Sequence, residues 1–175
     1  MSHPSHATIG GRLLAAVLAA ALLVACGGSD SNDSNPRTAA LDVPFSAADG
    51  GSARLGDFAG TPVVVNLWAT WCPPCVKEMP AFDEVAAELD GRVSIIGVSV
   101  ADEPAAAAAF AADLGVTYPI YGDPDGGLQT AFSVVSLPAT VFIGADGTVL
   151  DVHSGAYTAD ELRAAINSSF PEQGP

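Results

Sequence analysis

The chain has 175 residues with 20 acidic and 6 basic side chains, which gives a formal net charge of −14 at pH 7. All the acidic residues follow Cys26, so the folded part has a negative surface that repels nucleic acids and anionic lipid headgroups. About 130 residues remain after the N-terminal segments, which is enough for one hydrophobic core. We therefore expect one domain, a monomer, and no nucleic-acid partner.

The first 40 residues have the pattern of a leader followed by a tether. Residues 13–25 form an apolar run of 13 residues, shorter than the roughly 20 that span a bilayer and typical of a signal-peptide core. The run ends in Leu-Val-Ala-Cys at 23–26, which resembles the bacterial lipobox, where the cysteine becomes a lipidated N-terminus. We predict a lipoprotein signal peptide at 1–25, lipidation of Cys26, and a flexible tether at 26–40. The alternative is an ordinary signal peptide in which Cys26 is coincidental.

Residues 41–170 carry alternating strand and helix signals, followed by a short tail at 171–175. Two short strands around Asp49-Gly50-Gly51 predict a hairpin within 41–54, and the apolar run 63–68 predicts a buried parallel strand. Apolar residues at helical spacing and a terminal Asp90-Gly91 indicate a helix over 73–89. The remaining elements are predicted as strands at 93–100, 118–121, 139–143 and 148–152, and as helices at 104–114 (capped by Asp102), 127–132 and 159–170. This order predicts an α/β fold with a central mixed sheet.

The chemistry centres on Trp71-Cys72-Pro73-Pro74-Cys75, at the junction between the buried strand 63–68 and the helix 73–89. A helix N-terminus offers unpaired N–H groups and a partial positive charge, which favour a thiolate over a thiol. Proline suits the first helical turn, where an N–H would have no partner. We therefore predict that Cys72, at an exposed helix end, is the redox nucleophile and that Cys75 resolves it.

Other uses of a Cys-x-x-Cys pair fit the sequence less well. A closed zinc site needs four ligands, whereas the only other cysteine is Cys26 and the only downstream histidine is His153. A purely structural disulfide would close a ring too small to gain much loop entropy. We predict no metal and no cofactor beyond the redox-active Cys72–Cys75 disulfide, and we assign no role to His153.

The segment from Val63 to Pro80, with its apolar strand, the Cys motif and Lys77-Glu78-Met79-Pro80, resembles the active-site segment of the thioredoxin superfamily. It is most similar to the membrane-anchored TlpA/ResA-like thiol-disulfide oxidoreductases, with a likeness that extends over residues 41–170. The resemblance implies a three-layer thioredoxin-like fold with an N-terminal β-hairpin and an inserted strand-helix unit near 118–132. It also implies thiol-disulfide exchange at the extracytoplasmic face of the cell membrane, on protein substrates such as apocytochrome c.

In this family the usual direction is reduction of disulfides in secreted or membrane-attached proteins, with electrons from a membrane thiol donor. The alternative is an oxidase that introduces disulfides into exported proteins, since the direction depends on a reduction potential that spans about 150 mV among such folds. A peroxiredoxin would carry a Thr three residues before the reactive Cys, where this chain has Ala69. A copper-chaperone-like module would use Cys-x-x-x-Cys, which is one residue longer than the spacing here.

The resemblance also suggests roles for residues around the Cys pair. Glu78 matches the acidic residue that handles protons in the ResA-like branch, and helical spacing places it inward beneath Cys75, where burial should raise its pKa. The alternative is that Glu78 is a solvated helix residue. Asn66 matches a buried Asp of cytoplasmic thioredoxins and cannot take a proton. Leu137-Pro138 matches the loop whose cis-proline holds the substrate chain extended, and Trp71 is expected to shield the site and contact substrate, or else to be a core aromatic.

Overall fold

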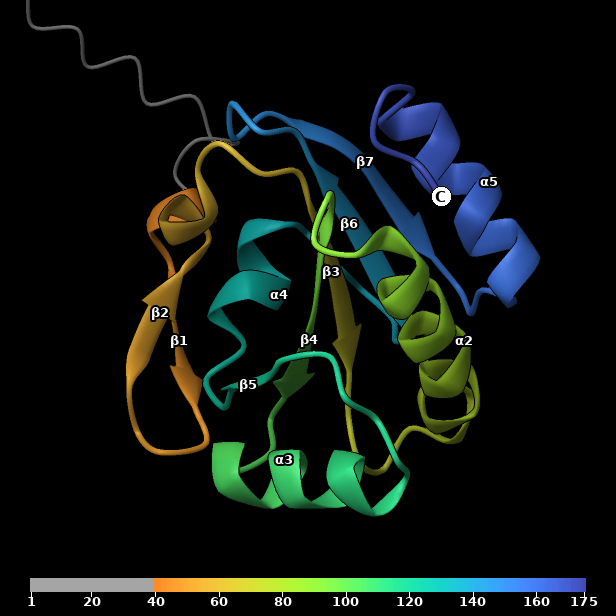
Figure 1. The fold of residues 1–175 in the computed structure, drawn as a ribbon. Helices are drawn as coiled ribbons and strands as arrows, with labels where there is room; N and C mark the ends of the chain where they lie inside the picture. Colours follow the sequence, from red (N-terminus) through yellow and green to blue (C-terminus); the bar gives the residue numbers. More distant parts are fainter. Residues whose placement is uncertain (1–39) are drawn as a thin grey trace, which may run out of the picture. The chain divides into compact units, whose positions relative to one another are not determined.

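In the computed structural model, which describes residues 40–175, strand β3 (Val63–Trp68) lies inside a seven-stranded sheet (Figure 1). The other strands are β1 (Pro44–Ala47), β2 (Ser52–Arg54), β4 (Ser94–Val100), β5 (Ile120–Asp123), β6 (Ala139–Ile143) and β7 (Val149–Ser154). The α-helices are α2 (Pro73–Leu89), α3 (Pro104–Asp113), α4 (Gly127–Ala131) and α5 (Ala159–Ser169), and the short 3₁₀-helices are η1 (Ala40–Asp42) and η2 (Leu55–Phe58). The predicted signal peptide and lipidated Cys26 lie outside the described residues.

The strands follow the order β2-β1-β5-β4-β3-β6-β7 across the sheet. The three central strands β5, β4 and β3 run parallel, whereas β6, β7, β1 and β2 each pair antiparallel with their neighbours. Parallel neighbours need a crossover, which α2 supplies between β3 and β4, and α3 between β4 and β5. The predicted α/β fold with a mixed central sheet, an N-terminal hairpin and an inserted strand-helix unit is therefore confirmed.

Side chains of β3 alternate between two apolar cores. Val64 and Trp68 point into the layer that contains α2, α3 and α5. The intervening odd-numbered residues of β3 point to the opposite face, together with Leu128 of α4 and Leu55 of η2. Asn66 falls on the α2 side because strand residues alternate between faces. The buried strand thus brings one polar side chain directly under the helix that carries the Cys pair.

Two strands near the site, β5 and β7, differ by two residues at one end or both from the sequence-based expectation. β5 begins at Ile120 rather than at residue 118, because Pro119 has no N–H for the ladder and the Tyr118 N–H is bonded to the carboxylate of Asp83 on α2. β7 extends to residue 154, so His153 lies inside the strand, where it pairs with Thr140 of β6. Both differences change the surroundings of the site, because they free Tyr118 from the sheet and place His153 in it.

The helix α2 is packed against the core from its first turn to its last, with buried residues from Cys75 to Leu89. It begins directly after Cys72, its N-cap residue, contains Pro80 as predicted, and ends at Asp90 in a left-handed conformation with φ of 49°. Helix α5 lies beside α2 (Figure 1). Arg163 of α5 forms ion pairs with Glu84 and Glu88 of α2. The Cys pair therefore stands on an element that is packed along its whole length.

Candidate active site

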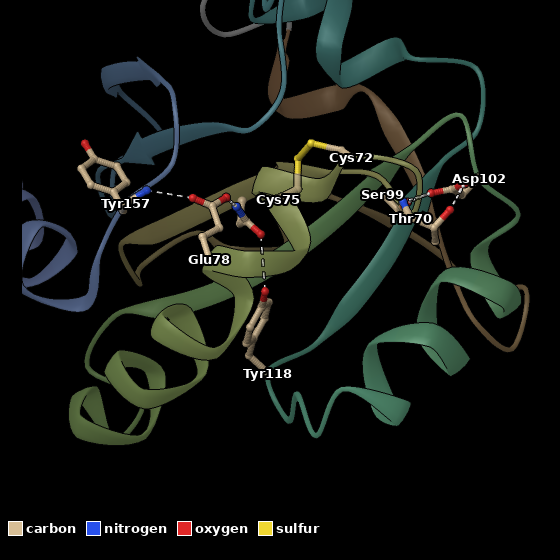
Figure 2. The surroundings of a disulfide bond; sticks show 9 residues. Thr70, Cys72, Cys75, Glu78, Ser99, Asp102, Tyr118 and Tyr157 are labelled. Atoms are coloured by element: carbon tan, nitrogen blue, oxygen red, sulfur yellow. Dashed lines mark hydrogen bonds between the residues drawn. A yellow bond between two sulfur atoms is a disulfide. The ribbon is translucent and has the colours of Figure 1, made fainter.

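Cys72 and Cys75 form a disulfide across the first turn of α2, with their Cα atoms 5.3 Å apart (Figure 2). The two intervening prolines occupy the first helical positions, and the backbone N–H of Val76 bonds to the carbonyl of Cys72 at 3.1 Å. Cys75 is fully buried and Cys72 is 5% exposed. The expectation of an exposed Cys72 is wrong, because its side chain packs in the same apolar cluster as Cys75 and Trp68. Cys72 is nevertheless the more accessible of the two cysteines, as predicted.

Glu78 lies one helical turn below the disulfide and is only 3% exposed, as its spacing predicts (Figure 2). Its carboxylate accepts a hydrogen bond from Nδ2 of Asn66 at 2.8 Å and one from the backbone N–H of Tyr157 at 2.9 Å. The pKa of Glu78 is raised from 4.5 to about 7, because desolvation raises it by more than the two hydrogen bonds lower it. Because Glu78 is only 3% exposed, the alternative that it is a solvated helix residue is wrong. A pKa of about 7 suits this carboxyl to proton exchange near neutral pH.

Two members of the hydrogen-bond network around this carboxylate were not expected from the sequence. Tyr157 contributes its backbone N–H, for which a side-chain motif gives no signal. Tyr118 places its hydroxyl 3.4 Å from Oδ1 of Asn66, on the far side of the amide from Glu78 (Figure 2). Burial, together with the charge of Glu78, raises the pKa of Tyr118, so this phenol stays protonated. The carboxylate therefore stands at the end of a short chain of buried polar groups.

A second carboxylate, that of Asp102, lies on the other side of the disulfide from Glu78 and binds the segment that leads into Cys72 (Figure 2). Its carboxylate accepts hydrogen bonds from the backbone N–H and from the Oγ1 of Thr70, both at 2.8 Å, and a further one from Ser99. Desolvation raises the pKa of Asp102, but the bonds from Ser99 and Thr70 together outweigh it and hold the pKa below its usual range. The prediction that Asp102 caps α3 is wrong, since the N-cap residue is Glu103.

A groove of about 430 Å³ opens beside Cys72. Trp71, 63% exposed, and Val135, 91% exposed, stand at this groove, so the alternative that Trp71 is a core aromatic is wrong. The Leu137–Pro138 peptide bond is cis, as predicted. Leu137 lines the groove, whereas Pro138 is buried behind it. Of the predicted substrate-contact residues, Trp71 and Leu137 thus meet at the groove beside Cys72, whereas Pro138 does not line it.

His153 and Asp123 lie outside this site and make structural contacts. Within residues 40–175, no three His, Cys, Asp or Glu side chains are grouped closely enough to hold a metal ion. His153 stacks on Tyr157 with ring centroids 4.2 Å apart, and Asp123 accepts bonds from the first backbone N–H groups of α4. In the same part of the chain, no helix has the length and apolar character needed to cross a membrane.

A redox-active Cys-x-x-Cys at a helix N-terminus, beside a cis-proline loop on this sheet, defines a thioredoxin-like thiol-disulfide oxidoreductase. The AhpC/TSA family matches residues 36–152, and the chain belongs to this family and to its ResA-like thiol-disulfide oxidoreductases.

Two curated relatives illustrate the likeness. The thiol-disulfide oxidoreductase ResA of Geobacillus thermodenitrificans is 32% identical over 75% of this chain and 76% of its own length. ResA of Oceanobacillus iheyensis is also 32% identical, but the chain spans only 66% of that relative's length. Among solved structures, MTB dsbF in mixed oxidized and reduced forms has a TM-score of 0.67 and 31% identity, over 74% of this chain and 96% of its own.

The raised pKa of Glu78 makes a prediction about stability. The unfolded chain ionises this group near its ordinary value of 4.5, whereas the folded chain does so near 7, so stability is lost as the pH rises between these values. At 1.36 kcal/mol per unit, the loss amounts to about 3 kcal/mol. With the disulfide intact, Glu78→Gln should therefore gain about 3 kcal/mol of unfolding free energy relative to wild type between pH 4 and pH 8.

Urea unfolding at a series of pH values measures this difference. Glu172→Gln, which removes an exposed carboxylate near the C-terminus, is the matched control and should follow the wild-type profile. Parallel profiles for wild type and Glu78→Gln would show that Glu78 ionises normally inside the fold.

Asp102 makes a second prediction about the anchoring of the active-site segment. Asp102→Ala leaves the partly buried N–H and hydroxyl of Thr70 without their acceptor, so it should lower the free energy of unfolding by about 2 kcal/mol. Glu103→Ala, at the exposed neighbouring position without a side-chain cap bond, should change stability by less than about 0.5 kcal/mol. Urea unfolding of both variants decides the matter, and equal stabilities would exclude the anchoring role of Asp102.

Proposed function

We propose that this protein exchanges its Cys72–Cys75 pair with disulfides of other proteins, acting as a reductase. The thiolate of Cys72 attacks a substrate disulfide and releases one substrate thiol, which leaves a mixed disulfide. Cys75 then loses its proton, attacks the sulfur of Cys72 and releases the second substrate thiol. The substrate gains two electrons and two protons, and the protein is left with the Cys72–Cys75 disulfide.

The observation that carries this proposal is the buried carboxylate of Glu78 one turn beneath a Cys pair. Cys75 is fully buried, and burial disfavours its thiolate, so the resolving step needs a nearby group that accepts the proton. Glu78, with a pKa of about 7, is part ionised at neutral pH and can take this proton directly or through one water. Asn66, the other polar side chain beneath the pair, cannot act as a base.

The substrate we propose is an extended protein segment with a Cys pair, such as that of an apocytochrome c before haem attachment. The groove beside Cys72 supports this, because exposed Trp71 and Val135 with Leu137 offer an apolar contact for residues that flank a substrate cysteine. Reduction is the usual direction in the ResA-like branch that the sequence resembles, and the curated relatives named ResA belong to that branch. A membrane thiol donor would then return two electrons to the pair after each turnover. An oxidase that introduces disulfides into exported proteins is the competing function.

The reduction potential separates these two functions. We expect a value for the Cys72–Cys75 pair nearer to about −270 mV, as in thioredoxin, than to about −120 mV, as in DsbA. Equilibration with glutathione or dithiothreitol buffers measures it, and a value near that of DsbA would establish an oxidase instead. In parallel, Cys75→Ser should accumulate mixed disulfides because resolution is lost, whereas the control Cys72→Ser should form none.

We further propose that the mature protein is a monomer attached to the outer face of the cell membrane by lipid on Cys26. The lipobox-like end of the apolar run supports lipidation. The net charge of −14 supports it as well, because an acidic domain gains nothing from anionic headgroups and its attachment then depends on acyl chains. Residues 26–40 would serve as the tether of the domain at 41–170.

Substitution of the anchor tests this location. Cys26→Ala should move the protein from the membrane fraction to the soluble fraction, and the acyl mass should disappear from the N-terminal peptide. A conservative change in the tether, Ser29→Ala, is the control and should leave both observations unchanged. If Cys26→Ala stays with the membrane and the native protein carries no acyl group, Cys26 belongs to an ordinary signal peptide.

A further inference from the structure

We propose that Tyr118 is a positioning residue for Glu78. Through Asn66, its hydroxyl fixes the hydrogen-bond donor that faces the carboxylate, and so tunes how readily Glu78 takes a proton. This inference rests on the proposed role of Glu78 in dithiol exchange and extends the site by one residue. Tyr118 does not line the groove beside the disulfide, and its hydroxyl bonds to the amide of Asn66.

The fold builds a dedicated place for the Tyr118 ring. Gly97 of β4 pairs with Asn66 of β3, and its missing side chain leaves a slot on the α2 side of the sheet. A Cβ at Gly97 would lie 2.9 Å from the Tyr118 ring and 2.7 Å from Ile120, so only glycine leaves room for the tyrosine there. The slot brings the phenol to a residue 52 positions earlier in the chain.

The backbone of the same segment is tied to the helix that carries Glu78. Asp83 of α2 accepts hydrogen bonds from the N–H and Oγ1 of Thr117, at 2.6 and 3.0 Å, and from the N–H of Tyr118 at 3.2 Å. Tyr118 is only 5% exposed, and its ring also packs against that of Phe82, with centroids 6.5 Å apart. The slot at Gly97 and the hydrogen bonds to Asp83 together determine where the Tyr118 hydroxyl lies.

The amide of Asn66 converts this placement into an effect on Glu78. The Tyr118 hydroxyl donates to Oδ1 of Asn66, and Nδ2 of the same amide donates to Oε1 of Glu78 at 2.8 Å. All donors in this chain point toward the carboxylate, so each bond polarises the next and the chain is strongest when Glu78 is charged. Without the hydroxyl, Oδ1 of the fully buried Asn66 loses its partner and the anionic form of Glu78 loses support.

The other groups around Glu78 do not replace this contribution. The second hydrogen bond to the carboxylate comes from the backbone N–H of Tyr157, which no side-chain substitution at residue 118 removes. The elements packed around Glu78 also carry other titratable or charged groups. These are Cys75, Lys77, Asp83, Glu84 and Glu88 on α2, Tyr118 before β5, Asp151 and His153 on β7, Tyr157 before α5, and Asp160, Glu161 and Arg163 on α5. Removal of the Tyr118 hydroxyl leaves every charge in this set unchanged at neutral pH.

Tyr118→Phe tests the proposal, because it keeps the ring in its slot and removes only the hydroxyl. The first readout is the titration of the Glu78 carboxyl carbon by NMR, which requires no activity. We expect its midpoint to move to higher pH by about half to one unit. The second readout is the rate of exchange with a model disulfide, which should fall about two- to fivefold at pH 7 and approach the wild-type rate at pH 9.

Tyr121→Phe is the matched control, since Tyr121 lies on β5, packs with the core of the opposite sheet face and has no contact with Asn66 in the described structure. It should leave both readouts unchanged. In an Asn66→Ala background, Tyr118→Phe should shift neither readout further, because the amide that transmits the effect is gone.

An unchanged Glu78 titration in Tyr118→Phe would overturn the proposal, and so would a shift that persists in full without Asn66. A shifted titration with an unchanged exchange profile would keep Tyr118 as a positioning residue of Glu78 while removing Glu78 from the proposed mechanism. The two proposals therefore fail separately.

Discussion

A carboxylate that is 3% exposed, inside an apolar core and one turn below a disulfide, is the constraint on which this site depends. Burial of an unpaired charge is costly, so donors must meet Glu78 from elsewhere in the fold. β3 supplies Asn66 for this purpose, and the segment before α5 supplies the N–H of Tyr157. That segment leads into α5, which Arg163 links to Glu84 and Glu88 of α2. Desolvation nevertheless has a larger effect on the pKa of Glu78 than these donors, so the carboxyl titrates close to neutral pH.

Two carboxyl groups, those of Glu78 and Asp102, lie on either side of the disulfide, and their pKa values are shifted in opposite directions (Figure 2). On one side Glu78 has its pKa raised by burial and is suited to moving a proton. On the other side Asp102 has its pKa held low by the bonds from Ser99 and Thr70, so it keeps its charge and ties the segment before Cys72 to the end of β4. Glu78 is thus suited to proton transfer and Asp102 to holding the active-site segment in place, and the different surroundings of the two carboxylates cause this difference.

The surface around the Cys pair differs from the rest of the molecule. The chain is strongly acidic, yet the groove beside Cys72 is lined largely by apolar side chains, with Trp71 and Val135 well exposed. Exposed aromatic and branched side chains next to a reactive sulfur suit contact with a protein segment better than contact with a small charged thiol. The acidic remainder maintains solubility and adds little to recognition.

The sequence by itself determined the order of the elements, the Cys pair at the start of α2, the inward direction of Glu78 and the proline loop beside the site. These features follow from periodicity and spacing within single elements, or from a motif whose family is recognisable. The tertiary structure alone decided that Tyr157 bonds Glu78, that Tyr118 reaches Asn66 and that Asp102 holds Thr70, pairs that are separated by 79, 52 and 32 positions. The depth of Cys72 and the exposure of Trp71 were also decided there. Such contacts arise only when several elements meet in space, because neither helical nor strand periodicity records what the neighbouring element brings.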